Sequence, residues 1–309
     1  MLLNGQILPV DESKVSLDEL IFPSLQAARI QAHVLRLDKI HPVISGNKWF
    51  KLKYHLLRAA AGNYRGILTW GGAYSNHLVA AACAAARAGI PITGIVRGER
   101  PVTLSHTLLA AQKYGMDLLF TSRENYRRRQ DPAYLQVLAG EYPDTLMVPE
   151  GGGGPEGIRG CQEILSLTDT RSFTDIICAA GTGTMFCGLL QASLVHQRMT
   201  GICVLKGLEG SDYEKDRMPG QNSRGGNYRI FHDYHQGGYA KKNPDLIDFM
   251  NNLYTNCGIP SDFVYTAKMF YGTLDLVQKG YFTANSRLLI IHSGGLQGNE
   301  SLSPGTLLF

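Results

Sequence analysis

The sequence predicts an α/β fold with two doubly wound lobes, each built around a parallel sheet. Three observations indicate this fold. Short apolar runs alternate along the chain with longer stretches of helix-forming residues. The runs are apolar throughout rather than at every second position, which is typical of parallel strands covered on both faces. With 309 residues, of which 44% are hydrophobic, the chain is long enough to bury two such cores.

The first lobe is predicted from four consecutive pairs of a strand and a helix. A strand over 67–70 ends at Gly71-Gly72, and the alanine-rich segment that follows predicts a helix over 78–87 with Gly89 as its stop. The same pattern predicts three further pairs. Their strands and helices are expected at 92–96 and 104–114, at 117–120 and 126–138, and at 146–148 and 158–167.

The second lobe is predicted from a later series of the same kind. Its elements are a strand over 175–180, a helix over 185–196, a strand over 202–205, a helix over 264–278 and a strand over 288–291. The glycine-rich segment 150–155 lies between the two series, and a hinge or tight connection is favoured there over direct ligand contact. The stretch 207–238 has neither a helical nor a strand period, so we interpret it as a lid or an insertion lining the site.

Composition and charge exclude several functional classes. The net charge is only +4, and the basic run Arg127-Arg128-Arg129 lacks the interleaved aromatic residues of a single-stranded nucleic-acid surface, so it is interpreted as a solvated helix face. No apolar stretch reaches about 18 residues, so we expect no membrane span. The six cysteines form no ligand pattern, so no metal site is expected. They are interpreted as buried, reduced thiols and, with a start that lacks a basic leader, predict a cytoplasmic protein.

Three polar segments stand where helices are expected to begin: Ser-Gly-Asn-Lys at 45–48, Tyr-Ser-Asn-His at 74–77 and Gly-Thr-Gly-Thr at 181–184. Ligands of doubly wound sheets bind beyond the carboxyl ends of the strands, which is where the loops 71–77 and 181–184 lie. The N–H groups and hydroxyls of 181–184 can wrap a phosphate at the positive end of a helix, although glycine and threonine are also common in turns and caps. The motifs for nucleoside triphosphates and dinucleotides are absent.

A lysine nucleophile is predicted at Lys48. Lys51 lies on about the same helix face at i+3, so each ammonium group lowers the pKa of the other, and partial desolvation lowers it further. An amine of this kind forms imines readily. Ser75 follows 27 residues later, enough for one helix, one strand and one turn, so both residues can return to the same crevice. An amine nucleophile beside a phosphate pocket suits pyridoxal phosphate.

Over nearly its whole length the sequence resembles the pyridoxal-phosphate enzymes of the tryptophan-synthase-β-like fold, or fold type II. Within them it is similar to the group that contains 1-aminocyclopropane-1-carboxylate deaminase and D-cysteine desulfhydrase. Segment 45–52, SGNKWFKL, is similar to the family motif G-N-K-x-x-K-L-E, and segment 71–77, GGAYSNH, to G-G-x-x-S-N. The segments 237–239, GGY, and 264–266, VYT, match two tyrosine-bearing segments of the family, and 292–295, HSGG, resembles its S-G-G loop.

The resemblance implies four catalytic residues. Lys48 would carry the cofactor as a Schiff base, and Ser75 would lie near the α-carbon and carboxylate of the substrate. Tyr239 and Tyr265 would lie over the bound substrate. The implied cofactor-binding set is Asn47, Lys48, Lys51, Asn76, Gly181, Thr182, Gly183, Thr184, Thr266 and Ser293.

Within that set, the resemblance places Lys51 near the phosphate, Asn76 near the phenolic oxygen and Ser293 near the pyridine nitrogen. We also expect a larger cofactor-binding domain formed by residues 1–47 and 155–309. A smaller domain, residues 48–154, would carry Lys48 and the Ser-Asn loop. The resemblance suggests that the protein is a homodimer.

Two positions bear on the reaction. In this family the deaminases have an acidic residue after the second tyrosine and an apolar residue before the last Gly-Gly, whereas the desulfhydrases have hydroxyl residues at both places. This chain has Thr266 and Ser293. A carboxylate near the pyridine nitrogen makes the ring a strong electron sink, which helps to open a cyclopropane that has no α-hydrogen. A hydroxyl leaves a weaker sink that suffices for β-elimination.

The favoured function is therefore β-elimination on a small amino acid, with D-cysteine and water giving pyruvate, hydrogen sulfide and ammonia. Only the resemblance supplies the D configuration. Lys48, or a tyrosine on the other face of the ring, would take the α-proton. One alternative is 1-aminocyclopropane-1-carboxylate deaminase, giving 2-oxobutanoate and ammonia, and another is a protein that binds pyridoxal phosphate but is catalytically idle. No nucleic-acid or membrane partner is expected.

Overall fold

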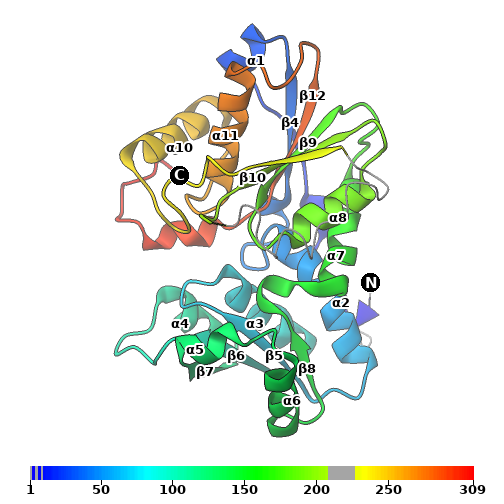
Figure 1. The fold of residues 1–309 in the computed structure, drawn as a ribbon, viewed down its shortest axis with the longest axis vertical. Helices are drawn as coiled ribbons and strands as arrows, with labels where there is room; N and C mark the ends of the chain where they lie inside the picture. The colour runs from blue at the N-terminus through cyan, green and yellow to red at the C-terminus, as the bar shows by residue number, and fades with distance from the viewer. Residues whose placement is uncertain (1, 4–5, 8–9, 208–226) are drawn as a thin grey trace.

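A computed structural model describes residues 2–3, 6–7, 10–207 and 227–309 and places two sheets at opposite ends of the molecule (Figure 1). The larger sheet has six strands in the order β11-β10-β9-β12-β4-β3. Its neighbours are parallel except for β3 and β4, which are antiparallel. The strands are β3 (Leu17–Glu19), β4 (Gln31–Arg36), β9 (Asp175–Ala180), β10 (Arg198–Cys203), β11 (Tyr228–Phe231) and β12 (Arg287–His292).

The smaller sheet has four strands in the order β7-β6-β5-β8, and all of its neighbours are parallel. The strands are β5 (Gly66–Gly71), β6 (Ile92–Arg97), β7 (Met116–Thr121) and β8 (Thr145–Val148). Near the N-terminus, β1 (Leu2–Leu3) and β2 (Gln6–Ile7) form a separate antiparallel pair. The two main sheets and their parallel strands confirm the predicted fold class.

Helices cover both faces of the larger sheet, with α1, α10 and α11 on one side and α7 and α8 on the other, while α2 packs mainly on α7 (Figure 1). The helices are α1 (Pro23–Ala27), α2 (Asn47–Ala61), α3 (Asn76–Ala88), α4 (His106–Lys113), α5 (Arg123–Arg127), α6 (Pro132–Glu141), α7 (Gly154–Gln162), α8 (Thr184–Ala192), α10 (Pro244–Cys257) and α11 (Thr266–Gln278). Short 3₁₀ helices occupy Glu12–Lys14, Leu37–Lys39, Glu150–Gly152, Glu163–Leu167 and Leu296–Ser301.

The central strand β9 shows why an uninterrupted apolar run makes a strand of this kind. All six of its residues are buried. Ile176 and Cys178 belong to the core shared with α2, α7 and α8, whereas Ile177 and Ala179 belong to the core shared with α1 and α11. Successive side chains of a strand point to opposite faces, so a strand covered on both sides must be apolar at every position.

The structure corrects several predicted elements. The helix expected over 126–138 is two helices, α5 and α6, because Pro132 cannot continue a helix that precedes it and instead occupies the first position of α6, capped by Asp131. The helix expected over 158–167 is α7 followed by a 3₁₀ helix. The helix expected over 185–196 ends earlier, at Ala192. No prediction was made for β3, β4, α1 or α10.

The stretch 207–238 also contains a strand that the prediction missed. Residues Tyr228–Phe231 form β11, which pairs in parallel with β10 at the edge of the larger sheet. Tyr228 and Ile230 pack on one core and Phe231 on the other, while Arg229 is exposed, so the strand is four residues long and shows no regular alternation of polarity. Most of the predicted lid, residues 208–226, lies outside the described residues.

All six cysteines lie in the described part of the chain as free thiols. Five are buried, as predicted, and Cys257 is partly exposed. Burial raises the pKa of the Cys161 thiol, in α7, to about 12. None of the described helices has the length and apolar character needed to cross a membrane.

Candidate active site

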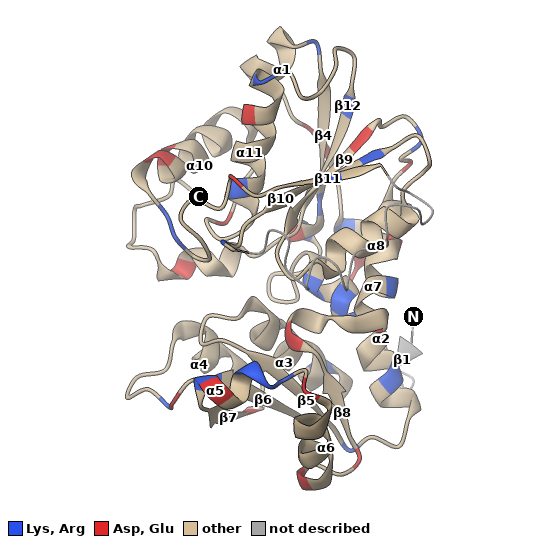
Figure 2. Cartoon of the chain, viewed as in Figure 1, with Lys and Arg blue, Asp and Glu red and all other residues tan. Residues whose placement is uncertain are grey.

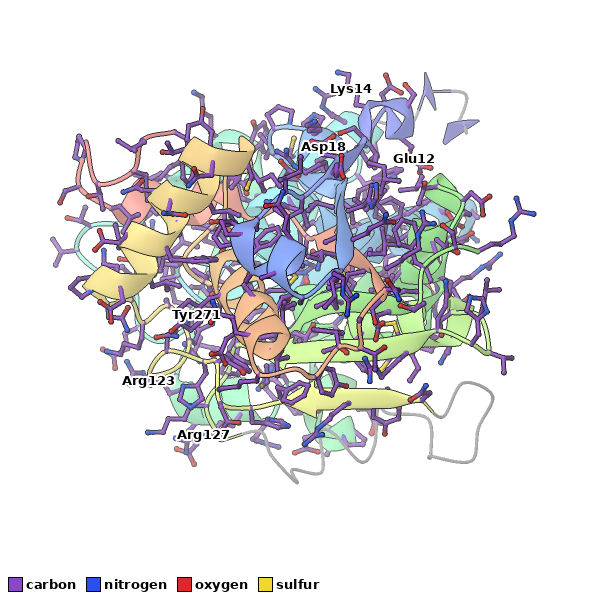
Figure 3. All side chains as sticks on the ribbon, turned by 90° about the horizontal axis from the view of Figure 1, so that it is seen from above. Glu12, Lys14, Asp18, Arg123, Arg127 and Tyr271 are labelled. Carbon is purple, nitrogen blue, oxygen red and sulfur yellow. The ribbon has the colours of Figure 1, made fainter. Side chains whose placement is uncertain are left out.

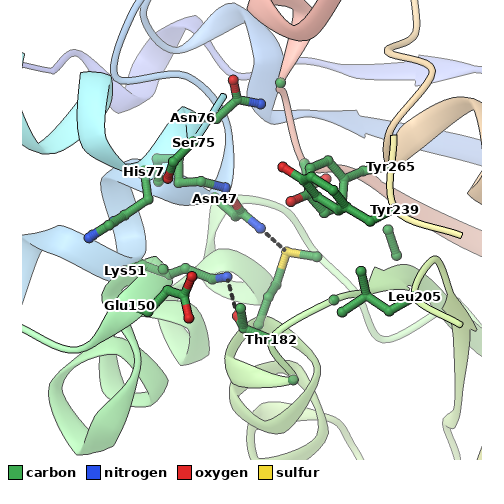
Figure 4. Close-up of a pocket in the computed structure, with 18 of the residues that line it drawn as sticks. Asn47, Lys51, Ser75, Asn76, His77, Glu150, Thr182, Leu205, Tyr239 and Tyr265 are labelled. Atoms are coloured by element: carbon green, nitrogen blue, oxygen red, sulfur yellow. Dashed lines mark hydrogen bonds between the residues drawn. The ribbon is translucent and has the colours of Figure 1, made fainter. Parts of the chain in front are cut away.

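A cavity of about 470 Å³ lies where strands of both sheets end and helices begin (Figure 4). It is reached by the loops that follow β5, β9 and β12, which is the location expected for a ligand of parallel sheets. Predicted site residues on its wall are Asn47, Lys48, Lys51, Ser75, Asn76, Gly181, Thr182, Gly183, Tyr239, Tyr265 and Ser293. Thr184 and Thr266 are buried behind the wall and do not line the cavity.

Lys48 lies in the first turn of α2, and its Nζ donates a hydrogen bond to Asn47 Oδ1 at 2.9 Å. The pKa of Lys48 is lowered to about 7, chiefly by burial and secondly by the charge of Lys51. This agrees with the prediction from the i+3 spacing of the two lysines. At neutral pH a large fraction of the Lys48 side chain is therefore an uncharged amine, the form that acts as a nucleophile.

The start of α2 is held against the loop that follows β12. Gly46 has a φ of +63°, and the Asn47 N–H donates to the carbonyl of Ser293 at 3.1 Å. A Cβ built on Gly46 would lie 1.9 Å from that carbonyl oxygen. Glycine is therefore required at this position both for its backbone conformation and for the close approach of the two loops.

The segment 181–184 forms the start of α8, with Gly183 at a φ of +70°. Lys51 is buried and its Nζ donates to Thr182 Oγ1 at 3.3 Å, so a cation lies beside the N–H groups of this helix start (Figure 4). The Thr184 hydroxyl lies 3.4 Å from Thr182 Oγ1. The glycine-rich connection also reaches the site, since Glu150 and Gly151 line the cavity.

Ser75 is both the N-cap of α3 and part of the cavity wall. Its Oγ accepts from the Leu78 N–H at 3.4 Å, and Asn76 and His77 of the first turn line the cavity beside it. The sequence is compatible with either a cap or a site residue, and the structure gives Ser75 both positions. Gly71 makes room for it, because a Cβ there would lie 2.7 Å from Ser75 Oγ.

His77 was not among the predicted site residues, although it is buried on the cavity wall. The Thr69 hydroxyl donates to the Val148 carbonyl and lies 2.8 Å from His77 Nε2, so Nε2 carries a proton and donates to Thr69. Burial, and then the charges of Lys48 and Lys51, hold the pKa of His77 well below its ordinary value. The imidazole is therefore neutral. Its position after Ser-Asn at a helix start was the only sequence signal for it.

Tyr239 and Tyr265 face the cavity together, with ring centroids 6.1 Å apart and an interplanar angle of 72°. Lys48 Nζ lies 5.9 Å from the centroid of the Tyr265 ring. The two hydroxyls are hydrogen-bonded to each other, and burial is the main reason why the pKa of each is raised. Both phenols are therefore protonated at neutral pH and can donate hydrogen bonds.

Two buried charges hold the tyrosines in place. Asp262 accepts hydrogen bonds from the backbone N–H of Tyr265 at 2.9 Å and from the Thr266 hydroxyl at 2.7 Å. Lys268, fully buried in α11, donates to the carbonyl of Gly238, next to Tyr239, at 2.7 Å. Neither residue was predicted, because Asp262 is a single charge in the loop before α11 and Lys268 a single charge in an apolar helix, and neither leaves a signal in the sequence.

The other unpredicted residues on the wall come from several parts of the chain. They are Gly72, Arg97, Arg129, Gln130, Glu150, Gly151, Ala179, Met185, Phe186, Leu205, Gly294 and Gly295. Among them Met185 contacts a predicted residue, since its Sδ lies 3.4 Å from Asn47 Nδ2 (Figure 4). Within the described residues no group of His, Cys, Asp and Glu side chains is arranged to hold a metal ion.

Comparison with known proteins identifies the family. Residues 22–294 match the family of pyridoxal-phosphate dependent enzymes. The chain belongs to this family. Among members of the pyridoxal-phosphate dependent family, it is 28% identical over 287 residues to a protein of Pyrococcus abyssi named as a candidate 1-aminocyclopropane-1-carboxylate deaminase, covering 87% of this chain and 86% of that protein.

Two other members extend the comparison. The chain is 26% identical over 279 residues to the mitochondrial bifunctional D-cysteine desulfhydrase/1-aminocyclopropane-1-carboxylate deaminase of Arabidopsis thaliana, covering 82% of this chain and 70% of that protein. A crystal structure of a homologue of 1-aminocyclopropane-1-carboxylate deaminase superposes with a TM-score of 0.75 at 25% identity, covering 93% of this chain and 90% of that chain.

The residues of the cavity fit the cofactor of this family. A phosphate would meet the Lys51 ammonium group, the Thr182 hydroxyl and the backbone at the start of α8, and an aldehyde would meet the Lys48 amine. Two glycines on the cavity wall leave space for the cofactor. A Cβ on Gly181 would lie 3.2 Å from the Tyr265 ring, and a Cβ on Gly151 would lie 3.1 Å from Thr182 Cγ2.

The lowered pKa of Lys48 leads to a prediction for the apoenzyme. The rate at which Lys48 is trapped by pyridoxal and borohydride should rise with pH through about 7, as the ammonium group loses its proton. In Lys51→Gln the midpoint should move upward, because one neighbouring positive charge is gone, and the trapping rate at neutral pH should fall several-fold. Pyridoxal is used because it lacks the phosphate that Lys51 would bind. Mass spectrometry of the labelled peptide measures the rate.

The control for this experiment is Arg58→Gln, which removes an exposed cation from the same helix. It should leave the midpoint unchanged. An unshifted midpoint in Lys51→Gln would show that Lys51 does not influence Lys48.

Proposed function

We propose that this protein catalyses β-elimination on a small amino acid, converting D-cysteine and water to pyruvate, hydrogen sulfide and ammonia. The observation that carries this proposal is the Lys48 amine, whose pKa of about 7 leaves it partly uncharged within a cavity that also holds Ser75 and two protonated tyrosines. When bound, pyridoxal phosphate supplies the electron sink that stabilises negative charge at the substrate's α-carbon.

Residues of the chain attach the cofactor, bind its phosphate and orient the reactive amine. We assign cofactor attachment to Lys48, and binding of the phosphate to Lys51, Thr182 and the backbone of 181–183. Thr184 supports this loop through its contact with Thr182. Asn47 orients the Lys48 amine, to which its Oδ1 is hydrogen-bonded.

Proton transfer is assigned to Lys48 rather than to a tyrosine. Once the substrate's amino group has replaced it, the Lys48 amine is free to take the α-proton, and a group with a pKa near 7 is well suited to this role. Tyr239 and Tyr265 have raised pKa values, which favours a role as hydrogen-bond donors to the substrate or its leaving group. Ser75, with N–H groups of α3 behind it, is assigned to the substrate carboxylate, and Asn76 to the cofactor's phenolic oxygen.

Elimination is favoured over opening of a cyclopropane by the groups near the end of β12. Ser293 offers a hydroxyl on the cavity wall, where we place the pyridine nitrogen. The Thr266 hydroxyl is bound to Asp262, so we assign it to holding the Tyr265 turn rather than to direct contact with the cofactor. A hydroxyl leaves the ring a weaker sink than a carboxylate does.

Product analysis tests the proposal. Purified holoenzyme is mixed separately with D-cysteine, L-cysteine and 1-aminocyclopropane-1-carboxylate, and sulfide, pyruvate and 2-oxobutanoate are quantified. We expect sulfide and pyruvate in equal amounts from D-cysteine. Formation of 2-oxobutanoate alone would assign the protein as a deaminase, and cofactor binding with no turnover of any amino acid would indicate an idle binding protein.

We further propose that residues 1–47 and 155–309 form the larger, cofactor-binding domain and residues 48–154 the smaller one. The division is supported by the sheets, because every strand of the four-stranded sheet lies between residues 66 and 148. We also propose a homodimer in the cytoplasm. Six free thiols are compatible with a reducing compartment, and sedimentation of the purified protein tests the dimer.

A further inference from the structure

A second cavity, of about 350 Å³, adjoins the one that holds Lys48. It is lined by Arg97, Arg123, Tyr126, Arg127 and Arg129. Arg97 and Arg129 belong to the walls of both cavities, so the two spaces share a boundary. Arg97 ends β6. Arg123 and Arg127, which Figure 3 labels, lie one helical turn apart on α5. Helix α5 lies beside the four-stranded sheet and carries basic residues (Figure 2). Arg127 and Arg128 of the basic run are exposed, as the predicted solvated face requires, and Arg127 and Arg129 also line this cavity.

The positive charges of this second cavity are only partly balanced. Arg129 Nε contacts Glu150 Oε2 at 2.7 Å, and the Tyr126 hydroxyl donates to Glu150 Oε1 at 2.6 Å, so both oxygens of that carboxylate are engaged. Within residues 10–207 and 227–309, Arg97, Arg123 and Arg127 form no ion pair with an acidic side chain. Like charges one turn apart destabilise a helix, so an anion in this cavity would relieve repulsion between Arg123 and Arg127.

The Tyr126 ring organises two of the arginines. The guanidinium carbon of Arg129 lies 5.0 Å and that of Arg97 5.9 Å from the ring centroid, and the ring itself is buried. A guanidinium held over a rigid ring keeps its N–H donors in a fixed direction, which favours binding of planar or tetrahedral oxyanions.

Arg97 also links this cavity to the loop assigned to the substrate carboxylate. A Cβ built on Gly72 would lie 3.7 Å from Arg97 Nη2. The Gly72 carbonyl accepts a hydrogen bond from the Ser75 N–H at 3.0 Å. An amino acid bound at Ser75 with a side chain directed toward Gly72 would thus approach the arginines.

We propose that Arg97, Arg123, Arg127 and Arg129 form a subsite for an anionic group at the far end of the substrate's side chain. The substrate class is then an amino acid whose β-substituent is a thioether ending in an acidic group. This inference rests on the β-elimination proposed above and extends it from cysteine itself to S-substituted cysteines.

The reaction balances for S-carboxymethylcysteine. The α-proton is removed, its electron pair forms the bond between the α- and β-carbons, and the bond from the β-carbon to sulfur breaks with its electron pair going to sulfur. The sulfur leaves as mercaptoacetate. The three-carbon product takes up one water and loses ammonia, so S-carboxymethylcysteine and water give pyruvate, ammonia and mercaptoacetate.

The test compares S-carboxymethylcysteine with S-carbamoylmethylcysteine, its neutral amide of nearly equal size, in both the D and the L form. Binding to the holoenzyme is measured by rapid-mixing titration of the cofactor's visible absorbance, and turnover by pyruvate release. We expect the acid to bind about tenfold more tightly than the amide, as for one charge-assisted contact, and expect the preference to shrink at high salt. The variant Arg123→Gln/Arg127→Gln should lose most of this preference, because only Arg97 and Arg129 of the subsite remain.

The matched control is Arg128→Gln, in the same basic run. Arg128 pairs with Asp131 at 3.1 Å, stacks over Tyr134, and lines neither cavity. It should leave the preference for the acid intact. A wild-type enzyme that binds acid and amide equally would overturn the subsite, as would a preference that Arg128→Gln abolishes as well.

Two further outcomes separate this proposal from others. If the holoenzyme binds S-carboxymethylcysteine more tightly than S-carbamoylmethylcysteine but turns over no amino acid, the subsite is supported and the proposed β-elimination is wrong. Inorganic phosphate that binds the wild type more tightly than Arg123→Gln/Arg127→Gln, without competing with S-carboxymethylcysteine, would show a separate anion site and overturn the assignment to the substrate.

Discussion

Replacing Lys48 by alanine should reduce turnover of every amino-acid substrate by about 10³-fold or more and should prevent covalent attachment of pyridoxal phosphate. The variant loses both the amine that anchors the cofactor and the base assigned to the α-proton. The cavity keeps Lys51 and the 181–183 loop, so the phosphate end of the cofactor should still bind weakly. Borohydride reduction followed by mass spectrometry measures the attachment, and pyruvate release measures the turnover.

The comparison for this variant is Lys113→Ala, which removes an exposed lysine from the last turn of α4. It should retain attachment and turnover. Covalent labelling of another lysine in Lys48→Ala, with turnover preserved, would move the anchor away from Lys48.

Replacing Gly46 by alanine should destabilise the apoprotein by about 3 kcal/mol and abolish tight cofactor binding. The new Cβ would meet the Ser293 carbonyl oxygen at 1.9 Å, on a backbone whose φ of +63° already disfavours alanine. Either the start of α2 or the loop after β12 must move, and Lys48 and Ser293 then separate. Denaturant unfolding measures the stability, and titration of apoprotein with pyridoxal phosphate measures the binding.

Gly89→Ala separates conformational strain from steric contact. Gly89 has a nearly equal φ of +67°, but a Cβ there has no atom within 4 Å. This variant should lose about 1 kcal/mol of stability and bind the cofactor normally. Equal losses in the two variants would show that the contact with Ser293 contributes nothing beyond backbone strain.

The fold and the meeting of the three polar segments at one cavity were predictable because both depend on local sequence patterns. Each strand of the smaller sheet was expected within one or two residues of its observed position, because short, continuous apolar runs bounded by glycines and polar residues are typical of buried parallel strands. A lowered pKa of Lys48 was expected from the spacing of two lysines at a helix start, although burial on folding lowers it more than the charge of Lys51 does.

The misses arose where tertiary contacts decide the structure. Nothing near Asp262 in the sequence shows that its carboxylate receives the N–H groups of the Tyr265 turn, because this depends on burial in the fold. Arg97 and Arg127 are separated by 30 positions, and only the neighbouring strand and helix bring them to one cavity. β11 was missed because a strand of four residues, one of them charged, is too short to stand out from a glycine-rich stretch.

The burial of the cysteines bears on which nucleophile an electrophile meets in this protein. Cys161 lies close enough to Lys48 and Lys51 that their charges favour its thiolate, yet burial still raises its pKa to about 12. Burial likewise raises the pKa of Cys83 and of Cys178. Only the thiolate attacks disulfides and electrophiles, so these sulfurs are unreactive at neutral pH. None of the six cysteines lines the cavity, so the aldehyde of a bound cofactor would meet the Lys48 amine without competition from a thiolate.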